Sequence, residues 1–155
     1  MAYLLDNPSR ILAAAQQHLW ITLVALALAL VIALPLGVAL ARRPRLYVAV
    51  MTVLSLVYTI PSISLLVLLI PVLGLGFWPT VVALVLYCQA ILVRNVVAGL
   101  RGVDPAVVEA ARAMGLSRAQ VLSRVELPLA MPVILAGVRV AALSTISIAT
   151  VAAFF

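Results

Sequence analysis

Residues 109–128 read EAARAMGLSRAQVLSRVELP, a polar stretch in a chain of 155 residues that is 67% hydrophobic. Long apolar runs lie on both sides of it, and residues 101–128 hold three of the four acidic residues and four of the ten arginines. Because an apolar run of roughly 20 residues can cross a bilayer as a helix, this pattern predicts a polar helix–turn–helix between two membrane spans. Such a segment is suited to docking a partner protein.

The composition of the chain argues against a soluble domain. Only 9% of the residues are charged and the mean hydropathy is +1.34, whereas a soluble domain needs far more polar surface. All ten basic residues are arginine and the net charge is +6. A basic chain can bind nucleic acid, but arginines gathered beside membrane spans set the orientation of those spans instead. We therefore expect an all-α integral membrane protein in a lipid bilayer, with no nucleic acid partner.

The apolar runs predict four membrane-crossing regions within a single domain over residues 1–155. These regions are residues 19–41, 46–76, 79–100 and 128–155. The second region is long for one straight helix and contains Pro61, and the residue before a proline avoids the helical conformation. It is therefore either one bent helix that crosses the membrane or one crossing helix followed by a short second piece. A turn is expected at residues 74–76.

The arginines predict the direction of these spans. Arg42, Arg43 and Arg45 directly follow the first apolar run, and further arginines follow the third run and populate the loop of residues 102–127. Arg10 precedes the first run. Because loops rich in arginine stay in the cytoplasm, we expect a multi-pass protein of the inner or plasma membrane. Its N-terminus should lie outside and its loop in the cytoplasm.

Start and stop signals predict a short first helix in the loop. Asp104 suits the N-cap, Pro105 the first helical position, and Gly115 the left-handed conformation that ends a helix. At three- and four-residue spacing, one face of this helix collects the apolar residues Val107, Ala110, Ala111 and Met114. Glu109 lies on another face. Since small side chains let another backbone approach closely, such a helix fits a groove in a partner protein.

A second helix is predicted directly after the first. Ser117 and Gln120 have the spacing of a capping box, and the helix is expected to end before Pro128, which opens the fourth span. The alternative is that the loop merely links two spans. Its 26 residues are generous for a link, because a few residues would connect two neighbouring helices.

The loop resembles the signature loop of the permease subunits of ABC transporters. The family pattern is Glu-Ala-Ala, three residues, Gly, nine residues, an aliphatic residue, one residue, then Leu-Pro. This chain matches the pattern at every spacing with Glu109-Ala110-Ala111, Gly115, Val125 and Leu127-Pro128.

The resemblance implies a binding-protein-dependent importer permease, a multi-span helical bundle of the MetI-like fold. In that family the first short helix of the loop is the coupling helix, which rests in a cleft of a cytoplasmic ATPase subunit. The residues implied for coupling are Glu109, Ala110, Ala111, Gly115, Leu127 and Pro128. A second permease subunit, identical or a sister chain, and an extracytoplasmic substrate-binding protein are also implied. This chain would need no cofactor, since the ATPase binds the ATP.

A second resemblance is to osmoprotectant permeases, which import glycine betaine, choline and carnitine. It rests on Thr59-Ile60-Pro61-Ser62, Leu65-Leu66, Leu69-Ile70-Pro71, Gly74, Gly76, Arg94-Asn95 and Gly99-Leu100. The chain departs from that pattern at Ile91, where a proline is expected. It also ends inside an apolar run, so a further span is expected beyond Phe155 and the sequence is interpreted as C-terminally truncated.

Polar side chains inside the spans predict the route of the solute, because such groups are costly in lipid and face a cavity or the bundle interior. The candidates are Tyr58, Thr59, Pro61, Ser62, Ser64, Tyr87 and Gln89, with Ser144, Thr145, Ser147 and Thr150 in the fourth span. The two tyrosines offer aromatic faces, which attract a quaternary ammonium. The alternative for the hydroxyls is a hydrogen bond within their own helix. Arg94 and Arg139 are expected at the inner interface, where long side chains reach toward water.

Other functions are also compatible with the sequence. An amino-acid or methionine importer permease would share the coupling loop, whereas an ATPase-independent channel or a membrane scaffold would not need it. An enzyme is disfavoured, because the sequence has no HExxH motif, no nucleophile–His pair, no P-loop and no acidic residue within a span. Cys88 is interpreted as a small apolar core residue and His18 as an interfacial residue, so no metal site is expected.

Overall fold

The computed structural model describes residues 8–152, and every regular element in that range is helical. The elements are α2 (Pro8–Ala41), α3 (Pro44–Thr59), α4 (Ser62–Leu73), α5 (Phe77–Arg101), α6 (Pro105–Ala113), α7 (Arg118–Val121), a π-helical segment η1 (Leu122–Glu126) and α8 (Leu127–Ala152). The predicted all-α fold is therefore confirmed. α2 begins ahead of the apolar run 19–41, because residues 8–18 are rich in alanine and other good helix formers.

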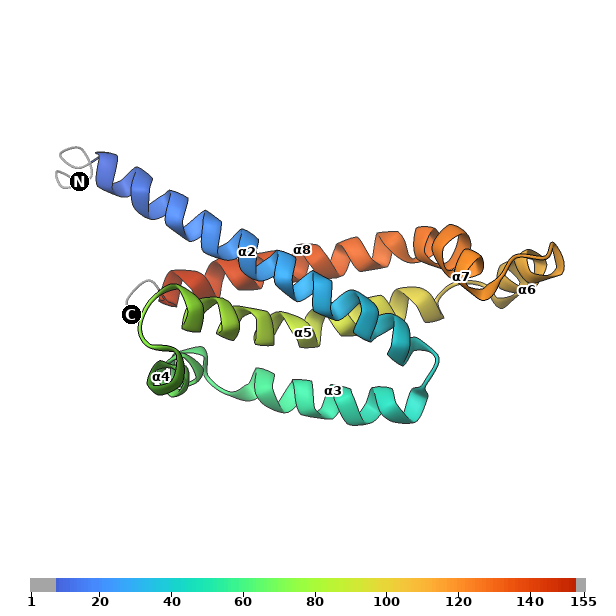
Figure 1. Ribbon diagram of the computed structural model, residues 1–155, viewed down its shortest axis with the longest axis horizontal. Helices are drawn as coiled ribbons and strands as arrows, with labels where there is room; N and C mark the ends of the chain where they lie inside the picture. Colours follow the sequence, from blue (N-terminus) through green and yellow to red (C-terminus); the bar gives the residue numbers. More distant parts are fainter. Residues whose placement is uncertain (1–7, 153–155) are drawn as a thin grey trace.

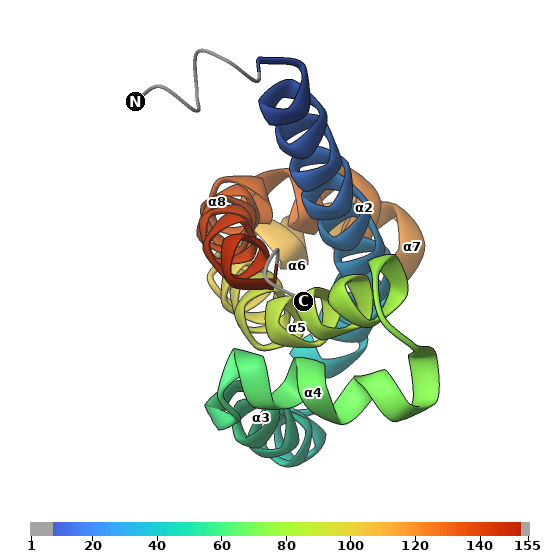
Figure 2. The same ribbon diagram turned by 90° about the vertical axis from the view of Figure 1, so that its left-hand side faces the viewer.

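The long helices α2, α5 and α8 pack together and form the body of the molecule (Figure 1). α3 runs alongside them, and α4 crosses the end of the bundle that lies away from α6 and α7, as the end-on view shows (Figure 2). By length and composition, α2, α5 and the continuous helix from Arg118 to Thr150 could each cross a membrane. α3 and α4 pass the same test only as a pair bent by 95°.

Small side chains allow α2 to lie close against α5. Ala25, Ala29, Ala33 and Gly37 recur at every fourth position along α2, and each is buried. A Cβ atom on Gly37 would lie 2.5 Å from Cγ1 of Val96, so no larger side chain fits there. Lipid tails are as apolar as leucine, so membrane helices associate through close packing of small residues and not through the hydrophobic effect.

A second set of small residues lies on α8 and faces α5. Ala130 and Ala141 are fully buried, and a Cβ on Gly99 of α5 would lie only 3.0 Å from the carbonyl oxygen of Ala130. At Gly137 no side chain fits, because a Cβ there would collide with the side chain of Asn95. α5 therefore forms the centre of the molecule, and it supplies most of the largest fully buried side chains: Val81, Leu84, Cys88, Leu92, Val93, Val96 and Val97.

The second apolar region divides at the predicted break, Pro61, into the two helices α3 and α4. The break leaves the carbonyl of Ile60 outside the regular helical bonding. The hydroxyl of Tyr87 on α5 donates a hydrogen bond to that carbonyl. In lipid such a bond matters, since every backbone polar group must find its partner within the protein. Gly74 and Gly76, both with positive φ, form the predicted turn into α5.

One predicted helix boundary is wrong. The sequence predicts that the second loop helix ends before Pro128, but the chain stays helical from Arg118 to Thr150. Pro128 has no N–H to donate, and its ring crowds the carbonyl one turn earlier. The π-helical segment η1 lies at this place, with a bond from the N–H of Leu127 to the oxygen of Leu122. Its wider turn accommodates the proline without ending the helix.

Replacing Gly137 with valine is expected to lower the thermal stability, because the new side chain would collide with Asn95 and push α8 away from α5. Overpacking of this kind costs about 1–3 kcal/mol. The measurement is the temperature at which the detergent-solubilised protein aggregates. The control is Ala136→Val, on an exposed position of the same helix. An equal loss in both variants would contradict the importance of this close contact.

Candidate functional site

Both helices of the loop between α5 and α8 begin with the caps that the sequence predicts. In α6, Oδ1 of Asp104 accepts a hydrogen bond from the N–H of Ala106 at 2.9 Å. In α7, Oγ of Ser117 accepts a bond from the N–H of Gln120 at 3.3 Å, and Oε1 of Gln120 accepts one from the N–H of Ser117 at 2.8 Å. These bonds satisfy backbone donors that a helix N-terminus leaves free.

The end of α6 is fixed by Gly115, which has a φ of 85°. Its N–H donates to the carbonyl oxygen of Arg112 at 2.9 Å, and the N–H of Leu116 donates to that of Ala111 at 3.3 Å. This pair of bonds is the Schellman motif, which closes a helix on a left-handed glycine. With both ends bonded, α6 is a stiff unit although it has only nine residues.

The faces of α6 differ in one respect from the prediction. Ala111 is only 2% exposed, and Val108 packs against the buried cluster that contains Val103 and Ala130. Ala111 therefore holds α6 to the rest of the molecule and does not share a free face with the other three apolar residues. We call the exposed apolar set the α6 outer face, which consists of Val107, Ala110 and Met114. Glu109 is also exposed.

Two arginines tie the turn between α2 and α3 to both ends of the loop. Nη2 of Arg42 lies 2.7 Å from Oε2 of Glu126 in η1, at the far end of the loop. Nε of Arg101, at the near end, donates to the carbonyl oxygen of Ala41 at 3.0 Å, and its guanidinium lies 4.7 Å from the ring centroid of Tyr47. Because the last carbonyls of a helix lack partners within it, Arg101 caps α2 and links it to α3 and α5.

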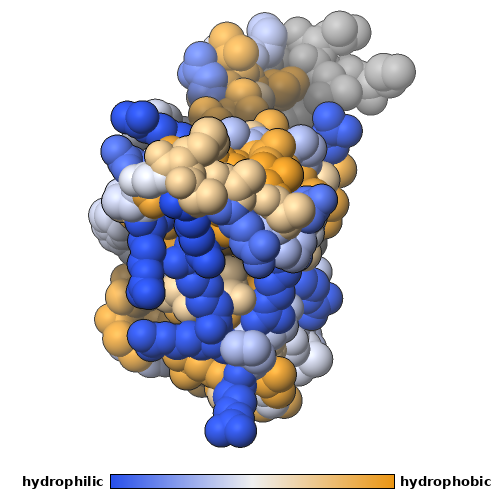
Figure 3. Space-filling model, turned by 90° about the vertical axis from the view of Figure 1, so that its right-hand side faces the viewer, coloured by the Kyte–Doolittle hydropathy of each residue, from blue (hydrophilic) through white to orange (hydrophobic). Residues whose placement is uncertain are grey.

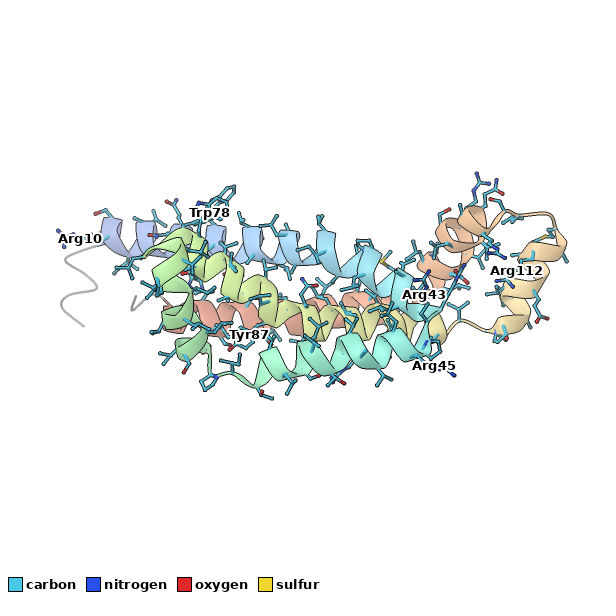
Figure 4. All side chains as sticks on the ribbon, turned by 60° about the horizontal axis from the view of Figure 1, so that its bottom comes forward. Arg10, Arg43, Arg45, Trp78, Tyr87 and Arg112 are labelled. Atoms are coloured by element: carbon cyan, nitrogen blue, oxygen red, sulfur yellow. The ribbon has the colours of Figure 1, made fainter. Side chains whose placement is uncertain are left out.

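The arginines are distributed unequally between the two ends of the molecule. Hydrophilic side chains cover much of the end that carries α6 and α7 (Figure 3). Arg43, Arg45 and Arg112 lie at this end, whereas Arg10 lies at the opposite end (Figure 4). Trp78 also lies toward the opposite end (Figure 4). The folded chain thus has one strongly basic end.

An open cavity of about 180 Å³ lies where α3, α5 and α8 meet. It is lined by Ser55, Tyr58, Ala90, Ile91, Arg94 and Val140. Tyr58 is one of the predicted path residues, and its ring meets that of Tyr87 edge to face, with centroids 5.7 Å apart. Ile91 is the position where the chain departs from the osmoprotectant pattern.

The other predicted path residues do not line this cavity. Thr59, Pro61 and Ser62 lie at the break between α3 and α4, where the hydroxyl of Thr59 bonds to a carbonyl of its own helix at 2.7 Å. Gln89 is buried, and its amide donates to the carbonyl oxygen of Ala29 on α2 at 3.2 Å. Its Oε1 has no hydrogen-bond partner among the described residues.

The hydroxyls of α8 mostly bond within their own helix, as the alternative interpretation predicts. These bonds run from Thr145 to Ala141 at 2.7 Å, from Ser147 to Leu143 at 3.0 Å and from Thr150 to Ile146 at 2.8 Å. Oγ1 of Thr145 also lies 3.0 Å from Sγ of Cys88, which is buried. Ser144 is half-buried and Ser64 is exposed.

Sequence reasoning did not reveal the contacts of Arg101 or the cavity beside Arg94. It treated Arg101 as an orientation signal and Arg94 as an interfacial side chain. The cap that Arg101 places on Ala41 joins residues 60 positions apart, and the cavity beside Arg94 is built from three helices. No local pattern could have revealed either arrangement, because both depend on which helix faces meet.

Removing the hydroxyl of Tyr87 is expected to destabilise the protein, because the carbonyl of Ile60 would lose its partner. Leaving a buried polar group unsatisfied costs about 1–3 kcal/mol. The Tyr87→Phe variant should therefore aggregate in detergent at a lower temperature than the wild type. The control is Thr52→Val, since Thr52 bonds to a carbonyl of its own helix at an exposed position. Equal stability of the two variants would contradict this role of the Tyr87 bond.

The apolar bundle and its capped polar loop are those of an integral membrane protein. A family model described as "Binding-protein-dependent transport system inner membrane component" matches residues 32–155. The chain therefore belongs to this family, which confirms the resemblance that its loop carries.

The chain is similar to several curated permeases. The carnitine transport permease protein OpuCB of Listeria monocytogenes is 38% identical, over 96% of this chain and 68% of the relative. The glycine betaine/carnitine/choline transport system permease protein OpuCB of Bacillus subtilis (strain 168) is 37% identical, over 99% of this chain and 71% of the relative. The osmoprotectant import permease protein OsmW of Salmonella typhimurium is 38% identical, over 97% of this chain and 73% of the relative.

The fold is also that of a solved transporter. A chain of the MetNI methionine ABC transporter, described in inward-facing conformations, matches with a TM-score of 0.75 and 28% sequence identity. The match covers 86% of this chain and 68% of that chain. The MetI-type permease fold that the loop predicts is therefore confirmed.

Proposed function

We propose that this chain is the permease subunit of an ATP-driven importer of quaternary-ammonium osmoprotectants such as glycine betaine, choline and carnitine. The observation that carries the proposal is α6, a stiff, capped helix at the end of an apolar bundle with an exposed apolar face. Three curated relatives that are 36–38% identical to this chain support this class of solute. One is a permease for carnitine, the second a permease for glycine betaine, carnitine and choline, and the third a permease for choline.

The ATPase partner would bind at α6, with the exposed residues Glu109, Ala110 and Gly115 in the contact. Ala110 on the outer face lets the partner's backbone approach closely, and exposed Glu109 supplies a charge at the rim. Ala111 acts from the inner side by seating the helix, and Gly115 fixes where it ends. ATP would be bound and hydrolysed by the partner subunit, and the solute would cross without chemical change.

Coupling needs a stiff connection from α6 to the bundle. α6 packs on α7 and η1, which continue through Leu127 and Pro128 into α8 without a break. Glu126 of η1 pairs with Arg42 beside α2, so a displacement of α6 would move α8 and α2 together. Driving an equilibrium from about 1:99 to 99:1 takes roughly 5.5 kcal/mol of differential binding. In this proposal, ATP-driven closure of the ATPase subunits supplies that free energy.

The complete importer would also contain a second permease subunit, identical or a sister chain, and an extracytoplasmic substrate-binding protein. Methionine is the second candidate solute, because the MetNI transporter shares the fold. Its 28% identity is below the 38% of the carnitine permease, so osmoprotectants are preferred. An ATPase-independent channel or scaffold would not require a capped coupling helix.

In the proposed orientation, the α6 end lies in the cytoplasm and the N-terminal end of α2 lies outside. The arginines support it, because Arg43, Arg45 and Arg112 gather at the α6 end and Arg10 lies at the other (Figure 4). Cytoplasmic loops carry such an excess of positive charge in membrane proteins.

Single cysteines introduced at Ser9 and Ser123 test this orientation. Both positions are exposed and the native Cys88 is buried. In right-side-out membrane vesicles, a membrane-impermeant maleimide is expected to label Ser9→Cys at once and Ser123→Cys only after permeabilisation. The reverse order of labelling would show that the topology is inverted.

Blocking the α6 outer face is expected to uncouple the permease from its ATPase. In Ala110→Arg, a long charged side chain replaces a small exposed one, so the fold is kept while the partner's backbone is held away. Copurification of the ATPase from mild detergent should fall by about tenfold or more, as for the loss of a well-packed contact at an interface.

The control for this experiment is Ala119→Arg, which introduces the same side chain at an exposed position of α7. It should retain the ATPase at the wild-type level. Absence of any ATPase from the wild-type preparation would reject the permease proposal and favour a channel or scaffold. Equal loss in both variants would show that α6 is not the specific docking element.

A further inference from the structure

Arg94 lies on the exposed side of α5, away from the basic end of the molecule. It stands two helical turns before Arg101, the last residue of α5, which places it about 10 Å deeper at 1.5 Å per residue. Ser55 and Tyr58, which line the same cavity, belong to the last two turns of α3, next to the bend at Pro61. The cavity therefore extends from Arg94 away from the basic end of the molecule.

No acidic side chain is paired with Arg94 in the described part of the chain. Asp104 and Glu109 belong to the loop, and Glu126 pairs with Arg42. Among residues 8–152, Arg94 makes neither an ion pair nor a side-chain hydrogen bond, and its exposed side chain is one of those that line the cavity. An unpaired charge within a membrane-spanning segment is costly, and such residues mark solute or ion pathways.

Tyr58 gives the same cavity an aromatic wall. Its side chain is 44% exposed, and its ring is steadied by the edge-to-face contact with Tyr87, at an interplanar angle of 75°. Tyr87 is itself held by its hydrogen bond to the carbonyl of Ile60. The bend between α3 and α4 thus fixes the ring that faces the cavity.

We propose that Arg94 and Tyr58 bind the two ends of a zwitterionic solute. The guanidinium of Arg94 would hold the carboxylate through paired hydrogen bonds, and the ring of Tyr58 would contact the quaternary ammonium. Glycine betaine and carnitine have both groups, whereas choline has only the ammonium. The volume of about 180 Å³ is below the roughly 300–1,000 Å³ of pockets for drug-sized ligands, which suits a small solute.

This inference rests on the proposed function and adds a selectivity to it. The permease itself, and not only the binding protein, would distinguish solutes that carry a carboxylate. A lipid headgroup phosphate is the other anion that a guanidinium could meet. The cavity favours the solute, because Tyr58, Ser55 and Ala90 lie on the side of Arg94 that faces away from the arginine-rich end.

The test compares uptake of glycine betaine and choline by the complete transporter in cells that lack other routes for these solutes. Arg94→Gln is expected to lower glycine betaine uptake by about tenfold or more relative to choline uptake, because one charge-assisted interaction is lost. Tyr58→Leu is expected to lower both uptakes, because both solutes carry the quaternary ammonium.

The matched control is Arg139→Gln. The contact of Gly137 with Asn95 sets the two antiparallel helices in register, so Arg139 on α8 lies at nearly the same level as Arg94 but does not line the cavity. This variant removes the same charge at the same depth and should leave the ratio of the two uptakes unchanged.

The possible outcomes separate the two proposals. Wild-type cells that take up neither solute would reject the proposed function itself. Suppose that wild-type cells take up both solutes and that Arg94→Gln lowers both uptakes equally or lowers neither. That result would overturn the carboxylate site, and Arg94 would then contact lipid or have a structural role. Should Arg94→Gln fail to reach the membrane, Arg94→Lys decides: a selective fall in glycine betaine uptake supports the site, and an unchanged ratio rejects it.

Discussion

The close approach of α5 to its two neighbours is the constraint on which the rest of the structure depends. Apolar side chains gain little by leaving lipid for a protein interior, so the helices are held by contact and not by exclusion from water. Gly37 on α2 and Gly137 on α8 permit this contact, because any side chain at either position would collide with α5. Every other feature, from the bend of α3 to the cavity, is positioned relative to α5.

Two prolines that disturb helical bonding, Pro61 and Pro128, are each accommodated by a specific feature of the structure. Pro61 interrupts the second apolar region, and the hydroxyl of Tyr87 bonds to the carbonyl at the break. Pro128 lies within a continuous helix, and the wider turn of η1 makes space for its ring. The first device depends on packing between two helices, whereas the second is internal to one helix.

The loop and the cavity are connected by the same two helices, α5 and α8. α5 precedes the loop and α8 follows it, and Arg94 on α5 and Val140 on α8 both line the cavity. Arg42 and Arg101 join the end of α2 to this connection. In the proposed importer, a shift of α6 at the surface of the ATPase would therefore reach the walls of the cavity without passing through a flexible segment.

The sequence by itself determined the helical membrane class, the turn at residues 74–76, and the caps at Asp104, Gly115 and Ser117. Hydropathy and capping act over a few residues, so they can be read along the chain. Only the tertiary structure decided that Ala111 faces inward, that Tyr87 bonds to Ile60, and that Arg94 lines a cavity. These features depend on which faces of distant helices meet, and in lipid that choice is made by the fit of small residues. The recurrence of small residues along α2 can be read from the sequence, but not the helix that they contact.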